Sequence, residues 1–139
     1  MKYNPERDQI ELSVTELCDM ALLGGHIDCR RSSQSLKMRA AEGKRVHSLL
    51  QSQFGATYHG EVELSNTSRL GEVYFHVNGR ADGIQCNDGI YVVDEIKTVT
   101  SKRYAGGIID ERHAAQLYCY AYFLCRTKDI SGVRASCIL

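Results

Sequence analysis

The sequence has no long apolar run, no excess of either charge and only one proline. No stretch approaches the roughly 18 consecutive apolar residues that a membrane-spanning helix needs, so we expect no membrane partner. The N-terminal segment is polar and lacks the apolar core of a signal peptide, which predicts a cytoplasmic protein. The 17 basic residues balance 17 acidic ones, whereas a stand-alone nucleic-acid binder is usually basic. Any affinity for nucleic acid must therefore come from a local patch, a metal ion or a neighbouring domain.

The sequence also lacks a C-x-x-C pair, although it contains six cysteines. Their spacing matches no standard zinc pattern. Disulfides are not expected in a chain without a secretion signal, so we interpret the cysteines as small buried side chains. They are Cys18, Cys29, Cys86, Cys119, Cys125 and Cys137.

Three helices are predicted in a chain whose 139 residues suit one domain. Ser13–Glu16 forms a capping box that begins the first helix, and Gly24-Gly25 ends it. The second helix is predicted over Ser33–Phe54, where apolar residues recur at steps of three and four and His47 falls within the apolar stripe. A third helix is predicted over about Glu111–Arg126.

Between and after these helices, short alternating segments predict strands. Asn78-Gly79 and Asp88-Gly89 are dipeptides typical of two-residue hairpin turns. The order of helices, antiparallel strands, helix and strand indicates an α+β or mixed-sheet α/β fold. The predicted strands are Thr57–Leu64, Glu72–Val77, Gly79–Cys86, Ile90–Lys97 and Gly132–Leu139.

The Asp88-Gly89 turn fixes a register that brings acidic residues together. With a two-residue loop, Asp82 lies directly opposite Glu95, and Lys97 shares their face of the sheet. A three-residue loop would instead place Asp94 opposite Asp82. We favour Glu95, because only Glu95 has a lysine two residues further on.

Two carboxylates at a cross-strand distance repel each other, and a divalent cation offsets that repulsion directly. Oxygen ligands favour Mg²⁺ or Mn²⁺. Lys97 beside such a cation could orient an attacking water or stabilise charge on a phosphate. Taken alone, the D…E-x-K pattern also fits a turn residue followed by a solvated strand face.

The segments that carry these residues resemble a known family. They are Gly79–Ile84 (GRADGI), Val92–Thr98 (VVDEIKT) and Gln116–Tyr120 (QLYCY). With the upstream His47, they resemble the RecB-like branch of the PD-(D/E)XK nucleases, over about Glu11 to Leu139. Within it, the chain is most similar to the nuclease-like N-terminal segments of bacterial DinG/XPD-like ATP-dependent DNA helicases.

The resemblance implies a metal site made by four residues. Asp82, Glu95 and the main-chain carbonyl of Ile96 would bind Mg²⁺ or Mn²⁺, with help from His47. A histidine among oxygen ligands suits Mn²⁺ somewhat better than Mg²⁺. The alternative for His47 is an ordinary histidine packed in the core.

The resemblance also implies catalytic roles. Asp82, Glu95 and Lys97 would carry the reaction, and Gln116 and Tyr120 would support the active site and contact DNA. The alternative for the Gln116 and Tyr120 pair is a helix–sheet packing contact. On the same helix, we expect the two tyrosines outside this pair to belong to its packed side; they are Tyr118 and Tyr122.

The fold that the resemblance implies is a restriction-endonuclease-like core over residues 1–139, either by itself or as the N-terminal part of a larger helicase. The function it implies is a metal-dependent deoxyribonuclease that hydrolyses phosphodiester bonds of single-stranded DNA beside a linked or partner helicase, in DNA repair or recombination. Two alternatives stay open. One is a catalytically inactive DNA-binding accessory module, and the other is a structural domain in which cysteines hold an iron–sulfur cluster.

Overall fold

The computed structural model describes residues 1–22, 33–53, 55, 57–96 and 111–138, the side chains of residues 33–40 excepted. In these residues, three helices flank one six-stranded mixed sheet. The predicted fold class, a mixed sheet with antiparallel hairpins flanked by helices, is confirmed. The elements are β1 (Lys2–Asn4), β2 (Gln9–Ser13), α1 (Val14–Ala21), α2 (Ser33–Gln53), β3 (Tyr58–Leu70), β4 (Val73–Asn87), β5 (Ile90–Ile96), α3 (Glu111–Lys128) and β6 (Arg134–Ile138).

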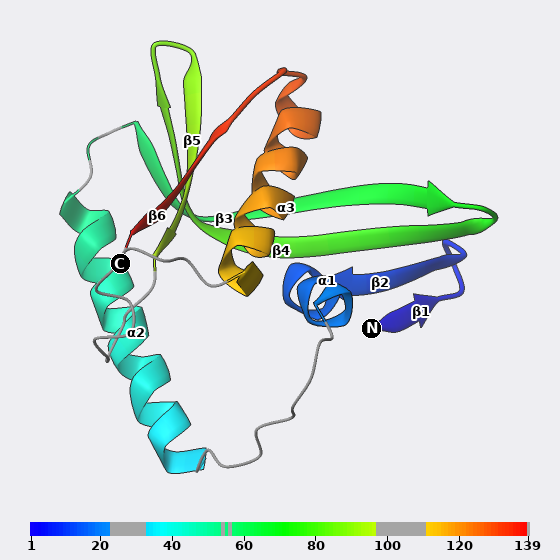
Figure 1. Cartoon of the computed structure of the whole chain (residues 1–139), viewed down its shortest axis with the longest axis horizontal. Helices are drawn as coiled ribbons and strands as arrows, with labels where there is room; N and C mark the ends of the chain where they lie inside the picture. Colours follow the sequence, from blue (N-terminus) through cyan, green and yellow to red (C-terminus); the bar gives the residue numbers. More distant parts are fainter. Residues whose placement is uncertain (23–32, 54, 56, 97–110, 139) are drawn as a thin grey trace.

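Strand β4 organises the sheet, whose order is β1-β2-β4-β5-β6 with β3 also paired to β4. The β2–β4 and β5–β6 pairs are parallel, and the others are antiparallel. Along one edge, β4 pairs with β3 to form a long hairpin (Figure 1). Along the other edge, it pairs with β2 at Tyr74–Asn78 and with β5 at Gly83–Asn87. Residues 79–82 of β4 therefore lie between two neighbouring strands, at a fork in the sheet.

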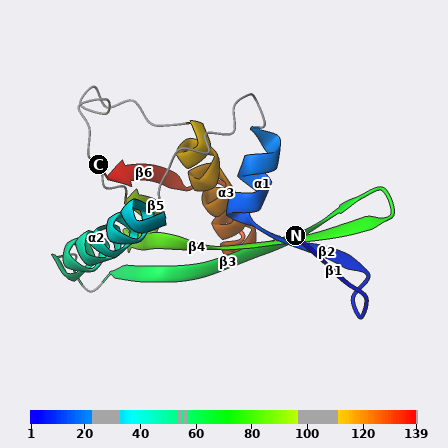
Figure 2. The same cartoon turned by 90° about the horizontal axis from the view of Figure 1, so that it is seen from below.

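The core lies between the sheet and helices α1 and α3. Figure 2 shows both helices on one side of the β3–β4 hairpin, with no described helix covering its other side toward the hairpin tip. Buried side chains come from the sheet and from these two helices, and no described residue of α2 belongs to the buried cluster. Its members are Leu12, Val14, Cys18, Leu64, Val77, Ala81, Ile84, Val93, Leu117, Tyr120, Phe123 and Leu124.

The helix predictions agree closely with the structure. Ser13 and Glu16 make both halves of the capping box, because the Glu16 N–H donates to Ser13 Oγ (3.1 Å) and the Ser13 N–H donates to Glu16 Oε2 (2.8 Å). Helix α2 covers Ser33–Gln53 of the predicted Ser33–Phe54, and α3 continues two residues past the predicted Arg126. The predicted ends at Gly24-Gly25 and Phe54 lie outside the described residues. No helix in the described part of the chain combines the length and apolarity needed to cross a bilayer.

The predicted turn at Asn78-Gly79 is wrong, because both residues lie inside the continuous strand β4. The hairpin reverses instead at Gly71-Glu72, where Leu70 pairs with Val73 and Gly71 has a φ of 64°. A packing contact accounts for the glycine at position 79. A Cβ there would lie 2.8 Å from Tyr120 Cε1 and 2.9 Å from Val14 Cγ2.

The structure differs from the sequence predictions in two further respects. The N-terminal strands β1 and β2 were not predicted, although Ile10 and Leu12 alternate with polar residues in β2. Tyr118 and Tyr122 do not belong to the packed side of α3: they are 69% and 52% exposed. The packed side of α3 carries Gln116 and Tyr120, both of which are buried.

Candidate metal centre

The β4–β5 hairpin has the two-residue turn that the sequence predicted. Asn87 pairs with Ile90, and both turn residues have positive φ (Asp88 52°, Gly89 77°), as a type I′ turn requires. Asp94 pairs with Gly83, so the alternative register that places Asp94 opposite Asp82 is wrong. Continued by one residue, the observed register places Glu95 opposite Asp82.

The regular pairing of β3 with β4 is also interrupted at Asp82. Gly60 pairs with Gly83 and Val62 pairs with Ala81, which leaves Glu61 opposite Asp82 without a regular ladder contact. Glu61 has a φ of 56°, in the left-handed region that non-glycine residues adopt at an energetic cost. Glu61, Asp82 and Glu95 therefore form one row of carboxylates across three strands.

Asp82 is held by side-chain and main-chain contacts from three elements. Its Oδ2 accepts a hydrogen bond from the Ile96 N–H (2.7 Å), and its Oδ1 lies 3.5 Å from His47 Nδ1. Its main-chain carbonyl accepts from Gln51 Nε2 (2.7 Å) and from the Tyr58 hydroxyl (3.4 Å). His47 and Gln51 are one turn apart on α2, so the same face of this helix contacts both the carboxylate and the main-chain carbonyl of Asp82. These contacts fix the orientation of the carboxylate where the ladder is broken.

His47, Glu61 and Asp82 form the group best suited to a metal ion among the described residues. One donor atom from each lies within 4.8 Å of the others. The side chains are 21%, 48% and 15% exposed, so the group is open to solvent mainly at Glu61. Octahedral ligands about 2.1 Å from a Mg²⁺ ion lie about 3 to 4 Å from one another, so a small inward movement would fit this group around one ion. Arg80 Nη1 also lies 3.4 Å from Glu61 Oε2.

Glu95 is buried (4% exposed) in the same row but is not a member of this three-residue group. The charge of Glu95 acts on Tyr120 of α3. Tyr120 and Gln116, one turn apart on this helix, are 6% and 8% exposed. Burial, with the nearby charges of Glu95 and Asp82, raises the pKa of the Tyr120 hydroxyl. Tyr120 therefore lies between the core and the acidic row.

The predicted metal and catalytic residues are thus only partly brought together. Asp82 and His47 are in contact, and Glu95 occupies the adjacent register position. The Ile96 N–H, rather than its carbonyl, makes the described contact with the site. Lys97 lies outside the described residues.

Sequence reasoning missed three residues of the site: Glu61, Gln51 and Tyr58. A turn at Gly71-Glu72 would have revealed Glu61, because that register places Glu61 opposite Asp82. Gln51 could have been found as the residue one helical turn after His47. The contact of Tyr58 with the Asp82 carbonyl has no local signal.

The Tyr58 hydroxyl is expected to contribute to the loss of stability at high pH. Burial, then the charges of Asp94 and Asp82, raise its pKa from 10.0 to about 12. The folded state thus favours the neutral phenol. The contribution of this group to the free energy of unfolding is complete below pH 10 and is lost as the pH rises toward 12. We expect the unfolding free energy of Tyr58→Phe to fall less steeply over this range than that of the wild type, measured by urea denaturation.

The matched control for this measurement is Tyr118→Phe, because Tyr118 is 69% exposed. This variant should keep the wild-type dependence. An equally steep fall in Tyr58→Phe and the wild type would show that the phenol of Tyr58 does not contribute to the alkaline loss of stability.

No protein-family model matches the chain, and no curated protein matches it. Its fold resembles a solved structure, "Crystal structure of SSO0001", with a TM-score of 0.58 and 26% sequence identity. The match covers 82% of this chain and 57% of that chain, so this chain spans little more than half the length of its structural neighbour. The likeness supports the mixed α/β fold.

Proposed function

We propose that the chain is a metal-dependent nuclease domain of the RecB-like PD-(D/E)XK type, with a restriction-endonuclease-like core, that hydrolyses phosphodiester bonds in single-stranded DNA. The observation that carries the proposal is the convergence of His47, Glu61 and Asp82 at the fork of the sheet. The segments that carry Asp82, Glu95 and Lys97 also resemble those of that family. Acting on DNA, the domain would work in the cytoplasm.

His47, Glu61 and Asp82 would hold the ion, joined by Glu95 or the Ile96 carbonyl after a local shift. A divalent ion supplies Lewis-acid chemistry: it lowers the pKa of a water molecule and neutralises charge on a phosphate. Manganese suits a site with one imidazole among carboxylates, and magnesium suits the carboxylates alone.

The protein's own groups would do the remaining work. The Ile96 N–H holds Asp82 Oδ2, so the other carboxylate oxygen is directed toward His47. To act as a ligand, His47 must be neutral, because a protonated imidazole has no free lone pair. Lys97, two residues beyond Glu95, would stabilise the charge that builds up on the phosphate. A helicase, linked or separate, would supply the single strand.

A metal titration tests the ligand set. We expect Glu61→Gln to weaken Mn²⁺ binding, measured by isothermal titration calorimetry, by about tenfold or more, because it removes one of the charged oxygen ligands. The control is Glu72→Gln, which changes an exposed glutamate at the tip of the same hairpin and should bind Mn²⁺ as the wild type does. Equal affinities for Glu61→Gln and the wild type would remove Glu61 from the site.

A cleavage assay tests the activity. The wild-type chain is incubated with single-stranded DNA in Mn²⁺, in Mg²⁺ and in EDTA, and product formation in either metal but not in EDTA is expected. Mn²⁺ binding at this site without cleavage would favour the alternative of a catalytically inactive DNA-binding module.

A further inference from the structure

A polar row continues from the metal group along the β3–β4 hairpin. Side chains alternate across a strand, so every second residue from Asp82 toward the hairpin tip points to one face. Arg80 follows this rule, because its guanidinium reaches Glu61 on the neighbouring strand. Helices α1 and α3 cover the other face of the hairpin (Figure 2). The cross-strand pairs on the polar face are Glu63–Arg80, Ser65–Asn78 and Thr67–His76.

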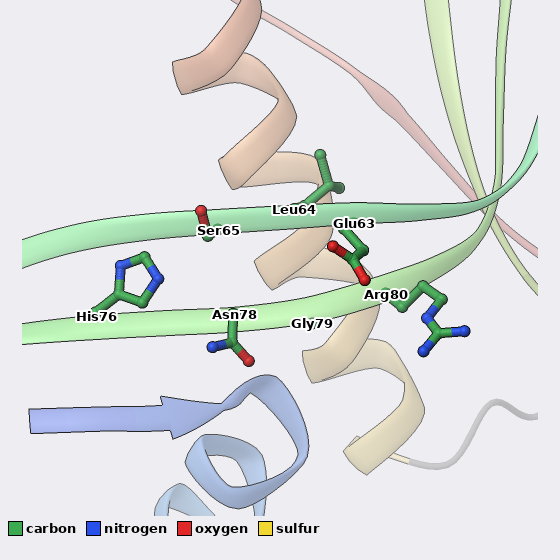
Figure 3. A pocket seen from close by; sticks show the side chains of 7 residues that line it. All are labelled: Glu63, Leu64, Ser65, His76, Asn78, Gly79 and Arg80. Carbon is green, nitrogen blue, oxygen red and sulfur yellow. The ribbon is translucent and has the colours of Figure 1, made fainter. Parts of the chain in front are cut away.

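An open hollow of about 650 Å³ lies over this row. Figure 3 shows that the side chains lining it come from the two neighbouring strands. Thr67 Oγ1 lies 2.9 Å from His76 Nδ1, which fixes the imidazole ring at one end. Arg80 lies at the other end, toward Asp82. The polar side chains that line the hollow are Glu63, Ser65, His76, Asn78 and Arg80.

The chemistry of this lining suits a nucleobase better than a phosphate. A phosphate needs an excess of positive charge, whereas here Glu63 balances Arg80. The edge of an unpaired base presents both hydrogen-bond donors and acceptors. Ser65 and Asn78 can each donate and accept, Arg80 donates and Glu63 accepts.

The distance from the hollow to the metal group agrees with the length of a short stretch of nucleic acid. From Asn78 to Asp82 the strand advances four residues, or about 13 Å. An extended single strand covers this distance in about two nucleotides. A duplex cannot offer a Watson–Crick edge to the hollow, because these edges are already paired.

We propose that this hollow binds an unpaired base of a single-stranded nucleic acid, one or two nucleotides away from the phosphate at the His47–Glu61–Asp82 group. The inference rests on the proposed function, since it places the hollow beside a scissile phosphate. It adds a site that selects single strands over duplexes and that can confer a preference among bases.

Binding without metal tests this inference separately from cleavage. Fluorescence anisotropy in EDTA measures the affinity of the full chain for a short fluorescein-labelled DNA strand, its duplex and the RNA strand of the same sequence. The double variant His76→Ala/Asn78→Ala should bind the single strands about tenfold more weakly, as expected for the loss of one or two hydrogen bonds. The control Asn66→Ala/Ser68→Ala changes polar residues on the opposite face of the same hairpin and should bind as the wild type does.

Each outcome of this experiment is decisive for the hollow. The base-binding proposal is supported if only the double variant loses affinity for the single strands and the duplex binds weakly. Equal binding of the DNA and RNA strands also supports the proposal, because the contacts are to the base. Unchanged affinity of the double variant, or duplex binding as tight as that of the single strand, overturns it. If the double variant does not fold, Asn78→Ala alone serves, because this side chain is exposed. Absence of metal-dependent cleavage with this binding pattern intact would instead count against the nuclease proposal.

Discussion

Replacing Asp82 by asparagine is expected to reduce metal-dependent cleavage of single-stranded DNA by about three powers of ten. Asp82 occupies the centre of the site, where it contacts His47 through one oxygen and the Ile96 N–H through the other. An asparagine oxygen can still accept from Ile96, so the fold should persist while the charge that holds the cation is lost. The charge stabilisation that a bound metal supplies is several kcal/mol, and each 1.4 kcal/mol corresponds to about tenfold in rate.

Asp88→Asn is the matched control for this prediction. Asp88 is exposed in the turn of the β4–β5 hairpin with a φ of 52°, a conformation that asparagine adopts well. This variant should cleave at the wild-type rate. Cleavage by Asp82→Asn at a rate near that of the wild type, with its fold verified by circular dichroism, would show that the reaction does not use this site.

Gly79→Ala is expected to destabilise the fold more than any other change at a described glycine outside the metal site. Its new Cβ would lie 2.8 Å from Tyr120 Cε1 and 2.9 Å from Val14 Cγ2, and both partners are buried. Overpacking of this kind costs about 1 to 3 kcal/mol. In a domain of this size, that cost lowers Tm by roughly 3 to 10 °C, which differential scanning calorimetry can measure.

Gly132→Ala provides the comparison, because a Cβ at Gly132 meets nothing within 4 Å. Its Tm should stay close to that of the wild type. A Tm for Gly79→Ala equal to that of Gly132→Ala would mean that β4 and α3 are not in close contact at Tyr120.

The predictable part of the fold came from signals carried by neighbouring residues. The Ser13–Glu16 capping box acts within one turn of helix, and the Asp88-Gly89 turn sets its own register because both residues adopt positive φ. That register was enough to place Asp82 and Glu95 opposite each other.

The rest depended on contacts between residues far apart in the sequence. Asn78-Gly79 has the composition of a hairpin turn, yet Gly79 is required by Tyr120 and Val14, which no local pattern reveals. Glu61 was not predicted as a site residue, because the wrong turn at Asn78-Gly79 excluded the register that places Glu61 opposite Asp82. Its left-handed backbone is also atypical of a strand residue.

The central claim is that His47, Glu61 and Asp82 hold one divalent cation. Crystals of the chain soaked in Mn²⁺ and measured at the manganese absorption edge test it most directly. We predict one strong anomalous peak within coordination distance of His47 Nδ1 and of carboxylate oxygens from Asp82 and Glu61. An absence of anomalous density between these three side chains, at Mn²⁺ concentrations that support cleavage, would contradict it.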